Sequence, residues 1–380
     1  MHKRLMIAAG LLALGIAGAQ PSKPEPSKPE PSKPEPSKPE SIRVGPGGVD
    51  FDKAAGVNLA AKNFRSKDGV LTIAIVTHTA GNGFFNPVYV GATAAAAEFT
   101  RAGLPINLLR LGPPDAADDI PEQLSILRAV LANPKIDGLA LTTPQAGAYK
   151  DIINKAFELG IPIATLNAYD PYLPRRNQIS HTGQTASAAA IAGEALVNDL
   201  VKRRVSSGSI LILNDLTANA DEANDRVKFA SEAIRNALKA RNSTGISLND
   251  GQGLGVSVRN GNTDDVLEVL RGTSDVVGVF AANGQITPAL ADAITTLKKN
   301  NQISAFGFDL GPAQLKAISE GALTGSLGQQ PFVQGYWPIK QLVLQIDRGI
   351  GAVNVDTRAE LVTKSNLAAF QKNVKTRFTN

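Results

Sequence analysis

The sequence predicts an α/β protein with two doubly wound lobes, each a mainly parallel sheet covered by helices on both faces. Apolar runs such as residues 70–77 (VLTIAIVT) and 276–281 (VVGVFA) do not alternate with polar residues, which is typical of strands buried on both faces. Amphipathic helical stretches separate the runs, as in βαβ units. The chain has 380 residues, more than the roughly 250–300 that one hydrophobic core organises, so we expect two lobes.

Strands and helices are expected to alternate along most of the chain. Each apolar run is bounded by turn residues, and each helical stretch repeats its apolar residues every three or four positions. The expected strands are residues 70–77, 106–111, 136–142, 161–166, 209–214, 276–281, 304–308 and 323–327. The expected helices are residues 88–101, 121–132, 145–159, 186–201, 221–239, 285–298 and 311–319.

Residues 1–19 have the pattern of an export signal. Lys3 and Arg4 precede an apolar stretch, and the small residues Ala17 and Ala19 flank Gly18 before Gln20. We expect cleavage before Gln20, with an uncleaved N-terminal anchor as the alternative. Because the sequence contains no cysteine, lipid attachment at a cysteine is excluded, and we expect a periplasmic protein free of the membrane.

Residues 21–40 consist of PSKPE written four times. A tract this rich in proline is expected to be an extended spacer, about 60 Å long at ~3.1 Å per residue. It could hold the protein away from a surface, tether it weakly to the cell wall, or be an expendable solvated tail. Residues 41–69 form a transition, with a short helical pattern at residues 53–64.

Composition and motifs argue against several classes of function. The net charge of +5 comes without a stripe of Lys and Arg, so we expect no nucleic-acid partner. A Cys/His zinc site and disulfides are excluded because cysteine is absent. The glycine-rich residues 251–255 (GQGLG) open no helical pattern and are expected to be a turn. No carboxylate pair, nucleophile elbow or Ser-His-Asp set follows the strands, so we expect no enzyme, cofactor or metal.

Polar and aromatic side chains follow the expected strands. Ligands of open parallel sheets bind beyond the carboxyl ends of the strands. Amides, hydroxyls, one imidazole and one carboxylate suit a neutral, polyhydroxylated ligand, and aromatic faces suit its C–H surface. No arginine that would compensate the carboxylate, Asp309, is evident. The candidate ligand-binding residues are His78, Asn82, Phe84, Phe85, Thr143, Asn167, Asn224, Asn283, Asp309 and Gln329.

Six motifs in order carry a resemblance to a known family. They are TIAIV with GNGFF near residues 72–85, QLSILRAVLANPKIDGLALTTP at 123–144, GIPIATLNA at 160–168, VVGVFAANGQITPAL at 276–290, AFGFDLGPAQLKAI at 305–318 and GQQP at 328–331. Over roughly residues 70–363 the chain resembles type I periplasmic sugar-binding proteins of the ribose-binding kind.

The resemblance implies two Rossmann-like lobes that close on a sugar. Their three crossings would fall near Thr182, Gln330 and Thr357. The N-terminal lobe would comprise residues 70–182 plus 330–357, and the C-terminal lobe residues 183–329 plus 358–380. The resemblance also implies sugar contacts for Asn82, Phe84, Phe85, His78, Thr143, Asn283, Phe308, Asp309 and Gln329.

The chain departs from ribose-binding members at two positions. Where they carry Asp-Arg after the fourth strand, this chain has Asn167 and Ala168. Where they carry an arginine early in a second-lobe helix, it has Asn224, with Arg226 two residues on. These departures argue for a larger sugar, a polyol or a modified sugar rather than ribose itself.

The predicted function is capture of a monosaccharide or related polyol and its delivery to the permease of an ABC importer, by a monomeric solute-binding protein. The alternative is a sensor component that presents the sugar-bound form to a membrane chemoreceptor or kinase. A sugar-responsive transcription regulator shares this architecture, but residues 1–69 contain no helix-turn-helix pattern.

Overall fold

The computed structural model describes residues 69–115, 118–217 and 221–378. The expected export signal, the PSKPE spacer and the helical pattern at residues 53–64 lie outside the described residues. No helix in the described part of the chain is both long enough and apolar enough to cross a membrane.

The first sheet has the strand order β12-β5-β4-β3-β1-β2, and all its pairs are parallel. Every residue of β1 is buried, as its unbroken apolar sequence predicts. The strands are β1 (Leu71–Val76), β2 (Ile106–Leu111), β3 (Ile136–Leu141), β4 (Ile163–Leu166), β5 (Ser180–Gly183) and β12 (Val355–Asp356).

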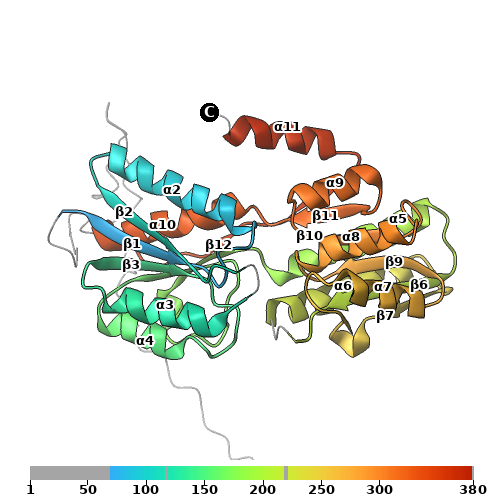
Figure 1. Ribbon diagram of the computed structural model, residues 1–380, viewed down its shortest axis with the longest axis horizontal. Coiled ribbons are helices and arrows are strands. Elements are labelled where there is room, and N and C mark those ends of the chain that lie inside the picture. Colours follow the sequence, from blue (N-terminus) through green and yellow to red (C-terminus); the bar gives the residue numbers. More distant parts are fainter. Residues whose placement is uncertain (1–68, 116–117, 218–220, 379–380) are drawn as a thin grey trace, which may run out of the picture. The chain divides into compact units, whose positions relative to one another are not determined.

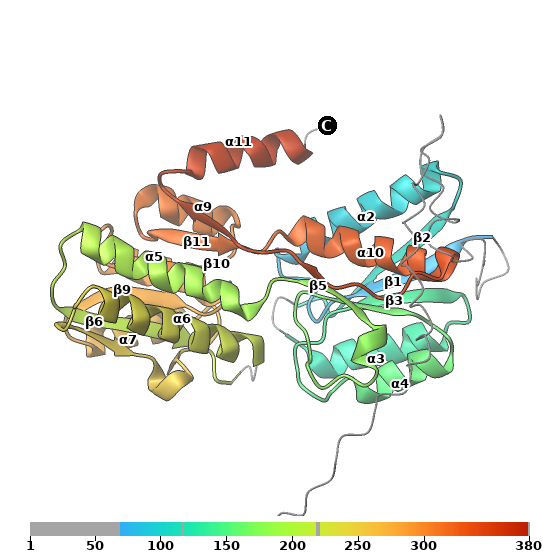
Figure 2. The same cartoon turned by 180° about the vertical axis from the view of Figure 1, so that it is seen from behind.

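Helices cover both faces of the first sheet. Helices α2 (Phe85–Arg101) and α10 (Pro331–Arg348) pack together on one face, and α3 (Ile120–Ala132) and α4 (Lys150–Glu158) cover the other (Figures 1 and 2). Glycines let α2 and α10 approach closely. A Cβ on Gly335 would lie 1.8 Å from the carbonyl oxygen of Val88, and one on Gly91 would lie 2.0 Å from that of Phe332.

The second sheet has the strand order β13-β11-β10-β9-β6-β7, with β8 paired to β6. All its pairs are parallel except that of β11 with β13. Its strands are β6 (Gly208–Asn214), β7 (Ile246–Asn249), β8 (Val256–Ser257), β9 (Val276–Ala281), β10 (Ser304–Phe308), β11 (Gly325–Gly328) and β13 (Glu360–Thr363).

Two hydrophobic clusters, one on each face, bury the second sheet. Helices α5 (Ala189–Lys202) and α6 (Asp221–Ala240) pack on one face. Helices α7 (Thr263–Gly272), α8 (Ile286–Thr296) and α9 (Pro312–Glu320), with the start of α11 (Leu367–Phe378), pack on the other. The expected fold class, two doubly wound α/β lobes, is therefore confirmed.

The chain passes between the two sheets three times. It leaves the first sheet after β5, returns between β11 and α10, and leaves again between β12 and β13. Side-chain amides tie these segments together, since Gln184 Nε2 donates to the carbonyl oxygens of Gly328 (3.2 Å) and Arg358 (3.0 Å). The limits of the two lobes given above stay predictions.

The helix expected at residues 145–159 is shorter than its pattern. It begins at Lys150, and the preceding loop is held by the Asp170 carboxylate, which accepts a hydrogen bond from the Gly147 N–H at 2.7 Å. The glycine-rich residues 251–255 form a turn, as expected. This turn contains one short 3₁₀ helix, Gly251–Gly253.

Candidate functional site

A cavity of about 120 Å³ lies where strands of both sheets end. All the candidate residues except Thr143 and Asn224 line it. The lining consists of His78, Asn82, Phe84, Phe85, Asp118, Pro144, Asn167, Ala168, Glu222, Ala223, Arg226, Asn260, Asn283, Gly284, Gln285, Asp309 and Gln329.

The first-lobe wall is built on two phenylalanines and a histidine. Phe85 begins α2 and is 1% exposed, so it belongs to the core, whereas Phe84 is only partly buried. Their rings meet edge to face at 5.2 Å, and the His78 ring meets Phe85 in the same way at 5.1 Å. Phe84 is therefore the ring with a face left for a ligand.

His78 is neutral at pH 7. Its Nδ1 lies 2.9 Å from Thr142 Oγ1, and its Nε2 lies 3.6 Å from Asp118 Oδ1. Burial lowers the pKa of His78, and the nearby Asp118 carboxylate opposes that shift only in part. The imidazole can therefore act as a hydrogen-bonding group without adding positive charge to the site.

Asn82 lies in the loop before α2, where its Oδ1 accepts a hydrogen bond from the Phe84 N–H at 3.0 Å. Because that bond uses the amide oxygen, the amide nitrogen is the end that Asn82 can offer to a ligand.

Two lining residues hold backbone conformations that are unusual for residues other than glycine. Asn167, directly after β4, has φ 58°, and Asp309, directly after β10, has φ 69°. Asn and Asp tolerate this left-handed region better than other side chains. A Cβ on Gly284 would lie 1.7 Å from Asp309 Oδ2, so any side chain there would displace this carboxylate.

An arginine does lie close to Asp309, which corrects the expectation from the sequence. Gln329 Nε2 donates to Asp309 Oδ1 at 2.6 Å, and Arg226 donates through Nη2 to Gln329 Oε1 at 2.9 Å. Arg226 also pairs with Glu222, and its guanidinium lies 4.0 Å from the centre of the Phe308 ring. Burial raises the pKa of Asp309, while the Gln329 hydrogen bond and the Arg226 charge oppose that shift.

Asn224 lies outside the cavity lining because of helical periodicity. Glu222 and Arg226 are four residues apart on α6 and share a face, whereas Asn224, midway between them, points elsewhere. Its Oδ1 accepts a hydrogen bond from Asn214 Nδ2 at 2.8 Å. The arginine early in this helix is thus present in the site as Arg226, two residues beyond the position expected from the resemblance.

Thr143 also lies outside the lining and links two segments of the first lobe. It is fully buried. Its Oγ1 donates to the Ala168 carbonyl oxygen at 3.3 Å and accepts from the Asp170 N–H at 2.9 Å. A hydroxyl that is occupied in this way holds the loops after β3 and β4 together.

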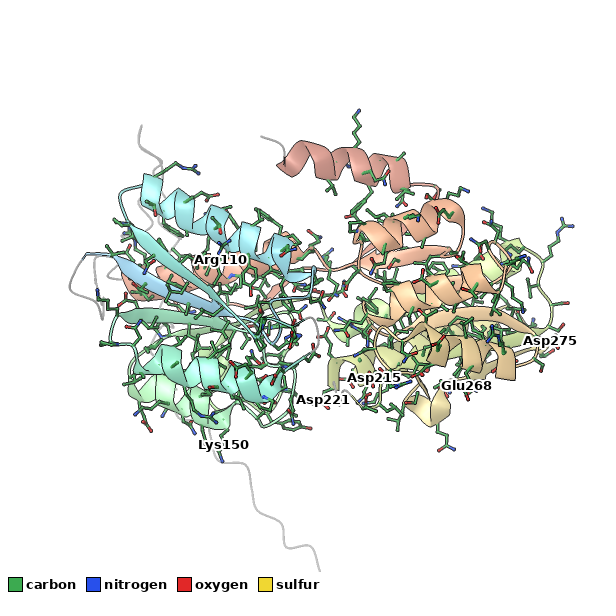
Figure 3. All side chains as sticks on the ribbon, in the orientation of Figure 1. Arg110, Lys150, Asp215, Asp221, Glu268 and Asp275 are labelled. Carbon is green, nitrogen blue, oxygen red and sulfur yellow. The ribbon has the colours of Figure 1, made fainter. Side chains whose placement is uncertain are left out.

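Asn283 and Asn260 form part of the second-lobe wall. Asn283 Oδ1 accepts from the N–H groups of Gln285 and Ile286 at the start of α8, and its Nδ2 donates to Asn260 Oδ1 at 2.9 Å. The Asn260 N–H donates to Asp215 Oδ2 at 2.7 Å. Asp215 follows β6 directly, and Figure 3 labels it together with Asp221, the first residue of α6.

The charge of the lining differs from the single acid expected. Asp118, Glu222 and Asp309 contribute carboxylates, and Arg226 is the one side chain of the lining that is always cationic. Burial raises the pKa of Glu222, while the neighbouring Arg226 opposes that rise. The site therefore carries an excess of acidic groups. Among the described residues, no group of three or more His, Cys, Asp or Glu is placed to share a metal ion.

A two-lobed α/β fold with a polar cavity at the strand ends of both lobes is the architecture expected of a solute-binding protein. A model of the periplasmic binding protein domain matches residues 73–350, and the chain belongs to this family.

Comparisons with individual proteins agree with that family. The xylose/arabinose-binding protein XylF of Sulfolobus acidocaldarius is 25% identical over 248 residues, which are 62% of this chain and 58% of that protein. This chain thus aligns with less than two thirds of that relative's length.

Solved structures share the fold. An ABC transporter solute-binding protein from Burkholderia graminis, in complex with D-arabinose, has a TM-score of 0.64 at 20% identity, over 80% of this chain and 99% of that one. GanP, a glucose-galactose binding protein from Geobacillus stearothermophilus, has a TM-score of 0.64 at 22% identity. The match covers 78% of this chain and 99% of GanP.

Proposed function

We propose that the protein captures a monosaccharide or related polyol in the cavity at the strand ends and delivers it to the permease of an ABC importer. One observation carries the proposal: the two lobes together surround a small cavity with amides, carboxylates, a neutral imidazole and a guanidinium. Groups of this kind match the alternating donors and acceptors of sugar hydroxyls. The partly buried ring of Phe84 suits the apolar face of a sugar ring.

The ligand we propose is uncharged. With three carboxylates and one guanidinium in the lining, a uronic acid or a sugar phosphate would bring a further negative charge into an acidic site. Arg226 is already paired with the Glu222 carboxylate, so a ligand anion would have to compete with Glu222 for its charge. Like charges at close range cost several kcal/mol in a partly buried site, which favours neutral pentoses, hexoses and polyols.

We propose that eight of the predicted residues, which line the cavity, contact the sugar together with Arg226. The eight are His78, Asn82, Phe84, Phe85, Asn167, Asn283, Asp309 and Gln329. Micromolar affinity requires about −8 kcal/mol. Charge-assisted hydrogen bonds contribute ~1.5–3 kcal/mol each and neutral ones ~1 kcal/mol, so six to ten such contacts suffice. Membership of the periplasmic binding protein family and the sugar-binding relatives described above support this reading.

The location and partners follow from the same proposal. The protein would act outside the cytoplasm as a monomer, after removal of its export signal, and its sugar-bound form would dock on a membrane permease. Pull-down from solubilised membranes, with and without sugar, tests the permease partner. Recovery of a chemoreceptor or kinase in place of a permease would favour the sensor alternative.

A thermal-shift screen tests the function. The panel contains D-arabinose, D-xylose, D-fucose, D-galactose, a polyol such as ribitol, and the anions D-galacturonate and D-ribose 5-phosphate. A ligand present at 100 times its dissociation constant adds about 2.7 kcal/mol of stability. We expect a clear upward shift with at least one neutral sugar or polyol and none with the anions. A shift with the anions alone would contradict the proposed ligand class.

A further inference from the structure

Gln334 is fully buried in α10 and does not line the cavity, yet it joins two residues that do. Its Oε1 accepts a hydrogen bond from Asn167 Nδ2 at 3.1 Å, and its Nε2 donates to the Gln329 carbonyl oxygen at 2.8 Å. Asn167 follows β4 of the first sheet, and Gln329 lies where the chain returns from the second sheet to α10.

The Gln329 carbonyl determines which way the Gln334 amide points. A carbonyl oxygen only accepts, so the Gln334 nitrogen must face it and the Gln334 oxygen must face Asn167. That oxygen in turn requires the Asn167 nitrogen. The Oδ1 of Asn167 is therefore turned away from Gln334 and remains as the acceptor that this residue can offer to a ligand.

Loss of Gln334 would affect Asn167 more than Gln329. The Gln329 carbonyl oxygen also accepts from Thr357 Oγ1 at 3.0 Å, so a second donor still holds it. Among the described contacts, Gln334 provides the hydrogen bond of the Asn167 side chain. The Asn167 backbone is held separately, since its N–H donates to the Thr182 carbonyl oxygen at 3.0 Å.

We infer that Gln334 is a positioning residue for the sugar site: it fixes the Asn167 amide so that its oxygen faces the ligand, and it anchors that orientation on the crossing segment at Gln329. The inference rests on the proposed function for its effect on sugar affinity. Its structural part concerns the unliganded protein and is tested separately.

The first experiment needs no ligand. Crystal structures of the unliganded wild type, Gln334→Met and Gln341→Met are compared. Methionine has a similar length and no amide. Gln341 is a matched control, because it is buried on the same helix and no hydrogen bond joins it to a lining residue in the described part of the chain. We expect the Asn167 side chain to leave its position in Gln334→Met only. An unmoved Asn167 amide in Gln334→Met would overturn the inference.

The second experiment measures sugar affinity by calorimetry with D-arabinose, below the melting temperature of every variant. We expect Gln334→Met to weaken binding about tenfold and Gln341→Met to leave it unchanged. In an Asn167→Ala background, Gln334→Met should weaken sugar binding less than twofold, because a positioning residue acts through the residue it positions.

The outcomes separate a positioning role from a merely structural one. If Gln334→Met lowers the melting temperature but leaves D-arabinose affinity at the wild-type value, the residue only supports the fold and the inference is wrong. An equal tenfold loss in both backgrounds contradicts it as well, because the effect would not pass through Asn167. Failure of the wild type to bind any sugar of the screen would count against the proposed function, while the unliganded structures would still decide the placement of Asn167.

Discussion

Gln329 donates a hydrogen bond from Nε2 to Asp309 Oδ1 at 2.6 Å and thereby joins the crossing segment to the carboxylate at the end of β10. The same amide accepts from Arg226 through its oxygen at 2.9 Å. One neutral side chain therefore separates the acid from the guanidinium. Asp309 Oδ2 is not used by Gln329, so it can accept hydrogen bonds from a ligand.

Replacement of Asp309 should weaken sugar binding without unfolding the protein. We expect Asp309→Ala to raise the dissociation constant for the neutral sugar that binds best in the screen at least tenfold, because charge-assisted hydrogen bonds contribute ~1.5–3 kcal/mol each. The fold should tolerate the change, because burial already penalises the charged carboxylate and raises its pKa, which offsets part of the ~1–2 kcal/mol cost of alanine in the left-handed backbone at this position. Asp292→Ala, at an exposed position of α8, is the control. An unchanged dissociation constant by calorimetry would remove Asp309 from the site.

The charge of the lining should determine which sugars are rejected. We expect the neutral sugar that binds best in the screen to bind at least a hundredfold more tightly than D-galacturonate, in which a carboxylate replaces the hydroxymethyl group of D-galactose. Glu222→Gln should reduce this difference in affinity, because it removes one carboxylate from the lining and releases Arg226 from its ion pair. Competition calorimetry at low salt measures both values. Equal affinities for the two sugars in the wild type would show that the acidic excess does not act on the ligand.

Stability should fall as the pH drops from about 6.5 toward 4, and His181 is one cause. Burial lowers the pKa of His181 from its ordinary 6.5 to about 4, with the Asp356 charge opposing the shift. A lowered histidine pKa means that the unfolded chain binds the proton first, so stability is lost as the pH falls through this window. His181→Asn should show a smaller loss between pH 7 and pH 4.5 in urea unfolding. An identical loss in both proteins would contradict this assignment.

Close packing of α2 on α10 should make Gly335 intolerant of any side chain. Gly335→Ala places a methyl group 1.8 Å from the Val88 carbonyl oxygen, so the helices must separate. We expect a loss of about 1–3 kcal/mol, as for other overpacked contacts. Gly351→Ala is the matched control, because a Cβ there meets nothing within 4 Å. Urea unfolding compares the two, and a loss of equal size in both variants would argue against the helix contact as the cause.

The fold could be predicted largely because buried parallel strands have a distinctive sequence. Strands β2, β9 and β10 begin and end where their apolar runs do. The expected strands do not include β5 (SHTG), β7, β8, β12 (VD) or β13, because each has four residues or fewer, and β5 is polar. Their pairing depends on neighbours distant in sequence, which a local pattern does not reveal. Helix α7 was missed too, although Asn262 caps it with a side-chain hydrogen bond to the Asp265 N–H.

The site could be predicted where its residues follow strands directly. Asn167, Asn283 and Asp309 line the cavity because parallel strands end together at one edge. Glu222 and Arg226 reach the cavity from the side of a helix, four residues apart. Their i, i+4 spacing was visible in the sequence, but nothing local showed that this face of α6 meets the strand ends. Asp118 lies in a loop, where no periodicity places a side chain.

The most direct test of the central claim is a crystal structure of the protein grown with the neutral sugar that stabilises it most in the screen. We predict electron density for that sugar between Phe84 and Asn82 on one side and Asp309 and Gln329 on the other. Density only elsewhere, for example in the groove between α2 and β2 near Arg101 and Arg110, with the cavity at the strand ends empty, would contradict the account.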